Sequence, residues 1–229
     1  MTQATIIIPV KDEEDGLEHL LEQYSTSEIQ YNGGLDFIFV IDGRTSDNSR
    51  EIAERFSQTI IDQKETHGKG SAIRQAVEEW MKNPTDYVIF LDADGSYPFN
   101  SVNGVLSALS EGADIVSGSR FLNHRGRPKG MSKLHYLGNR ALSLISKIRN
   151  RRNVSDLCTG LWGFKSNALK EIKIKSRGFD LEAELFGRSR KLDLNHVEIP
   201  VNWSQRKGGH SKLNSFKDGF IILLRIIRT

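Results

Sequence analysis

Short runs of apolar, mostly β-branched residues alternate with amphipathic segments along the first half of the chain. Each apolar run ends in a polar or glycine-containing turn, which is typical of buried strands. The runs cover Thr5–Val10, Phe37–Ile41, Thr59–Ile61 and Tyr87–Leu91. Helical periodicity occupies the intervals at Gly16–Tyr24, Asp47–Phe56 and Gly70–Met81. This alternation predicts an α/β fold in which a mostly parallel central sheet carries helices on both faces.

The second half of the chain lacks such regular alternation. Its pattern predicts helices and a strand, followed by shorter apolar segments. These are helices over Asn100–Leu109 and Leu134–Ile148, a strand over Asp114–Ser117, and apolar segments at Leu161–Phe164, Leu181–Arg188 and His196–Val201. Because no repeat, low-complexity tract or long linker divides the chain, we expect a single domain over residues 1–229.

The last apolar segment, Gly219–Ile227, contains one charged residue, Arg225. No apolar run approaches the roughly 20 residues that a membrane-spanning helix needs. The segment suits a core helix and an interfacial amphipathic helix equally well.

Charge is distributed unevenly, although the formal net charge of the 229 residues is only +3. This total is too small to indicate a nucleic-acid partner. Basic residues gather between Arg120 and Arg152 and between Arg206 and Lys217, so we expect the second half to face an anionic partner. The single Cys158 excludes an internal disulfide, and no leader segment opens the chain. Both features favour the cytosolic side of a membrane.

Acidic residues follow three of the predicted strands. Glu13 lies shortly after the first strand, Asp42 ends the second, and the triplet Asp92-Ala93-Asp94 ends the strand at Tyr87–Leu91. Ligands of parallel sheets bind beyond the carboxyl ends of the strands, so we expect these acids to share one cleft. Two carboxylates one residue apart suit Mg²⁺ or Mn²⁺ that also contacts substrate phosphates. Taken singly, each motif is equally typical of a solvated turn or a helix cap.

Two segments combine glycine with basic residues. His67–Arg74 opens a predicted helix, whose N-terminus can hold a phosphate. It lacks the spacing of a P-loop, and no dinucleotide-binding G-x-G-x-x-G follows the first strand, which disfavours an NTPase or a dehydrogenase. The second segment, Arg206–Lys212, contains two glycines that would let it close over a diphosphate.

In this order, the motifs resemble the family-2 glycosyltransferases, and within them the dolichyl-phosphate and polyprenyl-phosphate sugar synthases. The matching pieces are the Ile-Pro-Val strand with Glu13, Asp42-Gly43, Lys69-Gly70 with Arg74, Asp92-Ala93-Asp94, Gly118–Phe121, Asp156–Phe164, Phe179–Leu185 and Arg206–Leu213. The resemblance covers nearly the whole chain and implies a GT-A fold. It implies a nucleotide-binding half over 1–118, an acceptor-binding half over 119–213 and an amphipathic membrane-proximal helix over 214–229. Two positions depart from the family pattern: Ile41 replaces an Asp, and Ser96 replaces a Gln.

The resemblance implies transfer of a sugar from a UDP- or GDP-sugar to polyprenyl or dolichyl phosphate. We expect inversion at the anomeric carbon, because no second nucleophile accompanies the predicted metal site. Residues that the resemblance implies for donor binding are Pro9, Val10, Glu13, Asp42, Lys69, Arg74, Asp92, Ala93, Asp94, Arg206 and Lys212. Asp92 and Asp94 are implied to bind the divalent metal, Mg or Mn. Together with Arg120 and Glu184 they make up the expected catalytic set.

The expected acceptor, a phosphate monoester, is already ionised near neutral pH because its second pKa lies around 6. It therefore needs cations more than a strong base. Arg120, Arg140 and Lys133 suit this task, together with the basic loop around Arg125, Arg127 and Lys129. The same charges favour an anionic membrane surface.

Two other functions stay open. The first is transfer to a hydroxyl of a glycan or protein, for which Glu182 or Glu184 would be the general base. The second is a non-catalytic module that binds sugar nucleotides. We expect a cytoplasmic protein that is peripheral on the cytosolic face of the membrane. A membrane-protein partner and a transmembrane segment outside this chain stay open.

Overall fold

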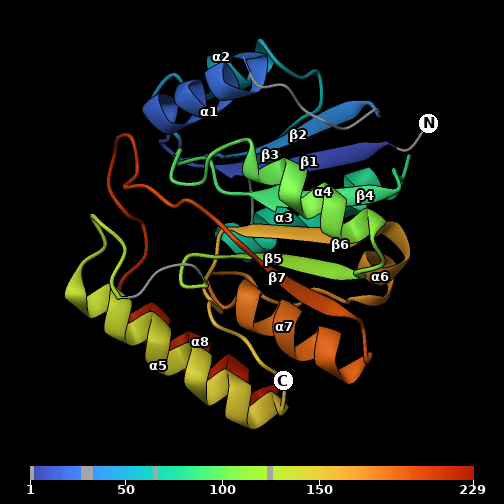
Figure 1. Cartoon of the computed structure of the whole chain (residues 1–229). Coiled ribbons are helices and arrows are strands. Elements are labelled where there is room, and N and C mark those ends of the chain that lie inside the picture. The colour runs from blue at the N-terminus through green and yellow to red at the C-terminus, as the bar shows by residue number, and fades with distance from the viewer. Residues whose placement is uncertain (1–2, 27–32, 64–66, 123–125) are drawn as a thin grey trace.

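The computed structural model describes residues 3–26, 33–63, 67–122 and 126–229. Its seven strands form one sheet in the order β3-β2-β1-β4-β6-β5-β7 (Figure 1). The strands are β1 (Ala4–Val10), β2 (Leu35–Asp42), β3 (Ile60–Gln63), β4 (Tyr87–Leu91), β5 (Ile115–Ser119), β6 (Leu161–Lys165) and β7 (His196–Pro200). Only β6 runs antiparallel to its neighbours, β4 and β5. The predicted α/β class with a mostly parallel sheet is confirmed.

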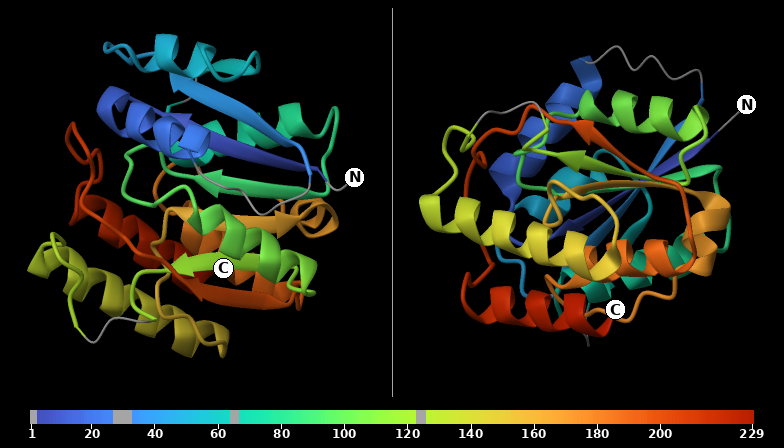
Figure 2. Two further views of the ribbon diagram at one scale, coloured as in Figure 1. Left: turned by 45° about the horizontal axis from the view of Figure 1, so that its top comes forward. Right: turned by 60° about the horizontal axis from the view of Figure 1, so that its bottom comes forward.

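Helices cover both faces of the sheet. They are α1 (Glu14–Thr26), α2 (Ser49–Glu54), α3 (Lys69–Trp80), α4 (Ser101–Ser110), α5 (Lys133–Asn150), α6 (Ser166–Glu171), α7 (Leu181–Lys191) and α8 (Lys217–Arg228). Figures 1 and 2 show α1 and α2 at one end of the molecule and α5 and α8 at the other.

Alternating side chains of each strand supply two separate hydrophobic cores, because successive residues of a strand point to opposite faces. In β1, Ile6 and Ile8 are fully buried in the core beneath α1, α2 and α4. Ile7 between them is fully buried in the other core, beneath α3, α6, α7 and α8. Burial on both faces explains why this strand reads as a continuous apolar run.

The predicted elements all exist, with shifted ends. The apolar segments at Leu161–Phe164 and His196–Val201 become β6 and β7, and Leu181–Arg188 lies within α7. The sequence pattern did not predict α6, a helix of six residues. Such a helix is too short to show amphipathic periodicity.

Helix α8 has one apolar face in the core and further apolar side chains exposed at the surface, so its core packing is observed and its interfacial role stays a prediction. Ile222 and Ile226 are buried in the core, whereas Phe220 and Ile227 are exposed. Within the described ranges, no helix combines the length and apolar character needed to cross a membrane.

Candidate functional site

A pocket of about 530 Å³ lies at the carboxyl ends of β1, β2, β3 and β4. Each of these strands contributes lining residues from its last positions or the turn that follows. Asp42 from β2 and Asp94 from the turn after β4 line this same pocket. The acids that follow neighbouring strands therefore share one cavity, as parallel pairing of β1 with β2 and β4 requires.

The turn after β4 is fixed by its neighbours. The Asp92 N–H donates to the Gly160 carbonyl over 3.1 Å, and the Ser96 N–H donates to Asp94 Oδ1 over 3.0 Å. A Cβ at residue 160 would overlap Asp92 Oδ2, so only glycine leaves room for this carboxylate. The start of β6 thus holds the acidic turn in place.

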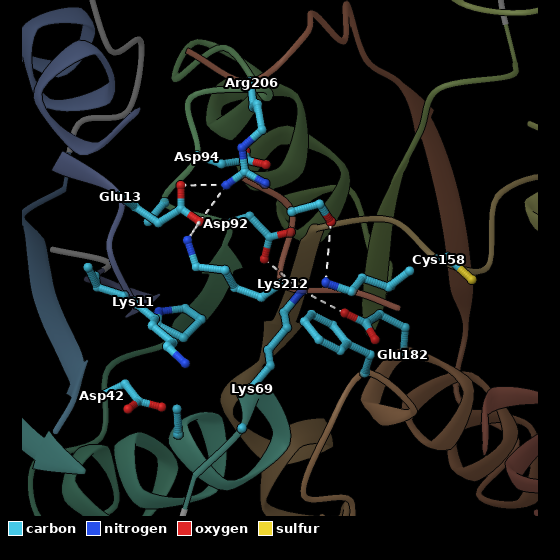
Figure 3. A pocket seen from close by; sticks show the side chains of 18 of the residues that line it. Lys11, Glu13, Asp42, Lys69, Asp92, Asp94, Cys158, Glu182, Arg206 and Lys212 are labelled. Carbon is cyan, nitrogen blue, oxygen red and sulfur yellow. Dashed lines mark hydrogen bonds and ion pairs between the residues drawn. The ribbon is translucent and has the colours of Figure 1, made fainter. Parts of the chain in front are cut away.

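Lys69, at the first position of α3, lies between two carboxylates (Figure 3). Its Nζ is 2.6 Å from Asp92 Oδ1 and 2.6 Å from Glu182 Oε1. Burial disfavours the charged amine, but the charges of Asp92 and Glu182 outweigh it and raise the pKa of Lys69 above its ordinary value. Burial also raises the pKa of Glu182, against the influence of Lys69. The cluster of three groups is thus held together by one buried cation.

The segment after β7 folds back over the same pocket. Arg206 donates to Glu13 Oε2 over 2.6 Å, and Lys212 Nζ lies 3.9 Å from Glu13 Oε1. The Lys207 N–H donates to the Asp94 carbonyl over 3.1 Å. Burial raises the pKa of Glu13, and the contact with Arg206 acts in the opposite direction. Two cations of this segment therefore face the acidic turns of β1 and β4.

Arg120, at the end of β5, is a buried and fixed cation. Its Nε and one terminal nitrogen contact Asp156 Oδ2 and Oδ1 at 2.6 and 2.7 Å. The terminal nitrogen also donates to the Cys158 carbonyl over 2.6 Å. Asp156 is fully buried. Bidentate pairing of this kind fixes both the position and the charge of a guanidinium.

Asp42 is buried and makes a bidentate pair with Arg44. The Arg44 Nε donates to Oδ1 over 2.9 Å, and its terminal nitrogen donates to Oδ2 over 2.8 Å. His67 Nδ1 lies 3.3 Å from Oδ1. Burial opposes ionisation of Asp42, but the hydrogen bonds from Arg44 prevail and lower its pKa to about 2. Asp42 therefore stays a hydrogen-bond acceptor at neutral pH.

Most of the side chains predicted for the site line this pocket. They are Pro9, Val10, Glu13, Asp42, Lys69, Asp92, Ala93, Asp94, Arg120, Arg206 and Lys212. Four others are not among the lining residues: Arg74, Lys133, Arg140 and Glu184. Lys133 and Arg140 are exposed on α5, and Arg140 lies 5.6 Å from the centroid of the Phe121 ring. Arg125 of the predicted basic loop lies outside the described residues.

Glu184 is a correction, since the structure places its carboxylate away from the pocket. The side chain is fully buried, and Oε2 accepts from the N–H groups of Lys175 and Ser176 over 2.8 and 2.6 Å. Oε1 accepts from Arg188 Nε over 2.9 Å. These bonds fasten the chain before α7 to that helix. Glu182, two residues earlier, is the acid of α7 that lines the pocket.

Several lining residues were not predicted from the sequence. They are Lys11, Arg44, Gln63, His135, Asn139, Cys158 and Phe179. His135 and Asn139 are four residues apart on α5, so both lie on one face of that helix. No local sequence pattern indicated that Asp156 would pair with Arg120.

The donor atoms at Asp92 and Asp94 fit a hard divalent cation. Among the described residues, no group of three or more His, Cys, Asp or Glu side chains could hold a metal by itself. Mg²⁺ is commonly bound by one or two carboxylates, with waters and substrate phosphates completing its shell. Lys69 already contacts Asp92, so Asp94 is the better placed of the two ligands. The residues thus fit a metal that arrives with a phosphate ligand.

Comparison with solved structures identifies the fold. The glucosyl-3-phosphoglycerate synthase from Mycobacterium tuberculosis in complex with UDP superposes with a TM-score of 0.68 at 16% identity, over 99% of this chain and 79% of that chain. Its complex with Mn²⁺, UDP-glucose and glycerol 3-phosphate gives a TM-score of 0.66 at 17% identity, over 90% and 73%. At this identity the similarity shows the fold alone, which is the expected GT-A arrangement.

Sequence relatives give the family. Glycosyltransferase AglJ of Haloferax volcanii is 30% identical over 224 residues, 97% of this chain and 70% of that protein. A dolichyl-phosphate hexose transferase of the same organism is 28% identical over 83% of this chain and 79% of that protein. The dolichol-phosphate mannosyltransferase of Pyrococcus furiosus is 23% identical over 92% and 59%. The family profile described as glycosyl transferase family 2 matches residues 5–173. With this match and the identity to AglJ, the chain belongs to glycosyl transferase family 2.

Proposed function

We propose that this glycosyltransferase moves a sugar from a UDP- or GDP-sugar to a polyprenyl or dolichyl phosphate, with inversion at the anomeric carbon. The observation that carries the proposal is one pocket that holds a paired acidic turn, Asp92 and Asp94, together with a buried fixed cation, Arg120. Relatives named as dolichyl-phosphate hexose transferase and dolichol-phosphate mannosyltransferase support the acceptor class. The neighbour crystallised with UDP-glucose and Mn²⁺ supports the donor class.

The donor would bind at the strand ends of β1, β2 and β4. Asp42, kept ionised by Arg44, can accept hydrogen bonds from a nucleoside. Departure of a nucleoside diphosphate builds negative charge on its phosphates, which preorganised cations stabilise. Arg206 and Lys212, from the segment that covers the pocket, are lining residues that can supply this charge.

Glu13 would act as a temporary partner for those cations. Its carboxylate contacts both Arg206 and Lys212. A diphosphate entering the pocket would compete with Glu13 for the same two side chains. We expect the exchange to couple donor binding to closure of the segment.

A divalent metal would be held by Asp94 with Asp92 beside it. As a Lewis acid, such an ion stabilises charge that develops on the leaving phosphate. Lys69 orients Asp92 from the opposite side, and Glu182 holds Lys69 in turn.

The acceptor phosphate would lie against Arg120. Since a phosphate monoester is ionised near neutral pH, it can attack the anomeric carbon without a general base. Its oxygen forms the new bond as the bond to the diphosphate breaks on the opposite face, which inverts the anomeric configuration. His135 and Asn139 line the pocket from α5, and Lys133 and Arg140 extend the cationic surface along that helix.

Glu182 favours a second candidate, transfer to a hydroxyl of a glycan or protein. It lines the pocket, and burial raises the pKa of its carboxylate, which is the direction that suits a general base. In that reaction Glu182 would take the proton of the attacking hydroxyl. The lysine contact argues against this role, because Lys69 lowers the proton affinity of the carboxylate and occupies one of its oxygens.

The test is transfer from UDP-glucose, UDP-N-acetylglucosamine and GDP-mannose to dolichyl phosphate with Mg²⁺ or Mn²⁺ present. We expect product from one of the three donors and a loss of at least roughly 100-fold in Asp94→Asn. Asp193→Asn is the matched control, because Asp193 is 87% exposed and its positive φ of 52° suits asparagine.

Three results would overturn the proposal, each in a distinct way. Full activity in Asp94→Asn would remove the role of the acidic turn. Transfer only to hydroxyl acceptors, abolished by Glu182→Gln, would favour the second candidate. Calorimetric binding of a sugar nucleotide without any turnover would indicate a non-catalytic module.

A further inference from the structure

Helix α5 has its apolar and polar faces inverted relative to an ordinary surface helix. Leu137, Leu144 and Ile148 are exposed, whereas the residues that α5 buries are Ser143, Ser146 and Asn150. A surface helix of a soluble protein normally buries its apolar stripe. These exposed residues recur at spacings of seven and four, so they form one stripe along the helix. This stripe is suited to an apolar partner.

Helix α8 continues the apolar surface beside α5. His135 Nε2 lies 2.8 Å from Ser215 Oγ just before α8, and Arg149 Nε donates to the Ile227 carbonyl over 3.3 Å near its end. The two helices therefore run side by side in the same direction, along one edge of the molecule in Figure 1. Phe216, Phe220 and Ile227 are exposed on or directly before α8.

We define the α5/α8 apolar face by six residues: Leu137, Leu144, Ile148, Phe216, Phe220 and Ile227. All six are between 53% and 79% exposed. Of the twelve large apolar residues exposed within the described part of the chain, nine lie on these two helices or directly before α8. This concentration is unlike single exposed apolar residues, which are normal on any protein.

Basic residues surround this face. Residues 126–155, which include α5, contain eight Arg and Lys and no Asp or Glu. Lys147, Arg149 and Arg151 are exposed near the end of α5, and Lys217 and Arg228 are exposed at the two ends of α8. An apolar stripe bordered by cations matches the interface of an anionic bilayer, with acyl chains below and negative headgroups around. The same cations would repel a second copy that docked face to face.

The same two helices also contribute residues that line the pocket. His135 and Asn139 of α5 and Ile222 of α8 line it, together with Leu213 just before α8. A surface that contacts the outer face would lie about one helix diameter, roughly 10 Å, from the pocket. A lipid phosphate could then reach Arg120 while its chain stays in the membrane.

We propose that the α5/α8 apolar face docks this protein on the surface of an anionic lipid bilayer. The inference rests on the proposed function in that the docked bilayer would supply the lipid-phosphate acceptor. The face itself is argued from exposure and charge.

Vesicle flotation tests the docking directly. We expect the protein to float with vesicles of phosphatidylcholine and phosphatidylglycerol, and to float less with phosphatidylcholine alone or at high salt. The triple variant Leu137→Ser, Leu144→Ser, Ile148→Ser should partition at least about tenfold more weakly. The matched control is the double variant Met81→Ser, Leu192→Ser, which removes exposed apolar side chains outside this face.

A second assay separates docking from catalysis. Transfer to a short-chain, water-soluble polyprenyl phosphate without vesicles should be unchanged in the triple variant, while transfer to long-chain acceptor in vesicles falls. If the wild type transfers sugar to neither acceptor, the proposed function fails. The docking inference is then still tested by the flotation of the wild type and the triple variant. Undiminished flotation of the triple variant would overturn the docking inference. So would a wild-type dimer in sedimentation that the triple variant abolishes, with no binding of either protein to vesicles.

Discussion

At the scale of single residues, charges in the pocket are paired across elements that are distant in sequence. Lys69 of α3 lies between Asp92 after β4 and Glu182 of α7. Each of these acids is costly to bury without a partner, because an uncompensated charge loses its hydration. One lysine therefore serves both the stability of the pocket and the orientation of Asp92.

Replacing Lys69 with methionine should lower both stability and activity. The change leaves Asp92 and Glu182 without their common cation, and breaking a buried pair in this way costs about 3 kcal/mol or more. Urea denaturation measures the loss of unfolding free energy. Lys82→Met is the control, since Lys82 forms an exposed pair with Glu79. Equal stability of Lys69→Met and the wild type would show that the bridge contributes nothing.

The Asp42–Arg44 pair makes stability depend on acid pH. The pKa of Asp42 falls from 3.8 to about 2 on folding, so the ionised acid favours the folded state. This contribution is fully present above pH 4 and disappears as the pH falls toward 2. Arg44→Gln should therefore be less stable than the wild type at pH 7, and the difference should shrink below pH 4. Urea denaturation at several pH values across this range tests the prediction. A stability difference between Arg44→Gln and the wild type that does not change with pH would show that the Asp42–Arg44 pair is not its cause.

At the scale of elements, the segment from residue 204 to 213 acts as a cover on the pocket. The Ser204 N–H donates to the Ser96 carbonyl over 2.9 Å, and Lys207 bonds the Asp94 carbonyl. Gly208 packs so closely on α1 that a Cβ there would overlap Asp15. The cover is therefore held on the acidic turn after β4 by backbone hydrogen bonds, and on α1 by the close approach of Gly208 to Asp15.

Gly208→Ala should displace this cover and weaken donor binding. The added Cβ meets Asp15, so Arg206 and Lys212 would sit further from the diphosphate. We expect KM for the sugar nucleotide to rise by about tenfold, with little loss of global stability. Gly34→Ala is the control, because a Cβ at residue 34 meets no atom within 4 Å. An unchanged KM in Gly208→Ala would mean that the position of the cover does not affect donor binding.

Much of this arrangement was predictable from the sequence. Strands buried on both faces read as apolar runs, and the acids that follow them mark the carboxyl edge. The choice between Glu182 and Glu184 was not predictable in this way. Residues two apart on a helix point about 200° from each other, so only one of them can face the pocket. Which one does so depends on how α7 packs beside α3.

The side chains that α5 contributes to the pocket could not be predicted from the sequence pattern either. Lys133 and Arg140 belong to the right helix, yet His135 and Asn139 are the side chains that line the pocket. Helical periodicity gives the relative directions of side chains but not the rotation of the helix about its axis. That rotation is set by tertiary contacts, here with α8.

At the scale of the whole molecule, one sheet joins β3, β2, β1 and β4 to β6, β5 and β7. Its topology brings Glu13 next to Arg206, which is 193 residues away. Membership of glycosyl transferase family 2 gives the reaction type, and the pocket holds the carboxylates and cations that we propose bind a metal and a diphosphate. The central claim is that the acids after β1, β2 and β4 form one site for a metal-bound nucleotide sugar.

Thermal unfolding with UDP-glucose, UDP-N-acetylglucosamine or GDP-mannose, each with Mn²⁺ or with a chelator, tests this claim most directly. A ligand at about 100 times its Kd should raise the Tm by roughly 5 °C or more. The account predicts this rise for one nucleotide class, only with metal, and its loss in Asp94→Asn. An equal rise with chelator present, or in Asp94→Asn, would contradict it.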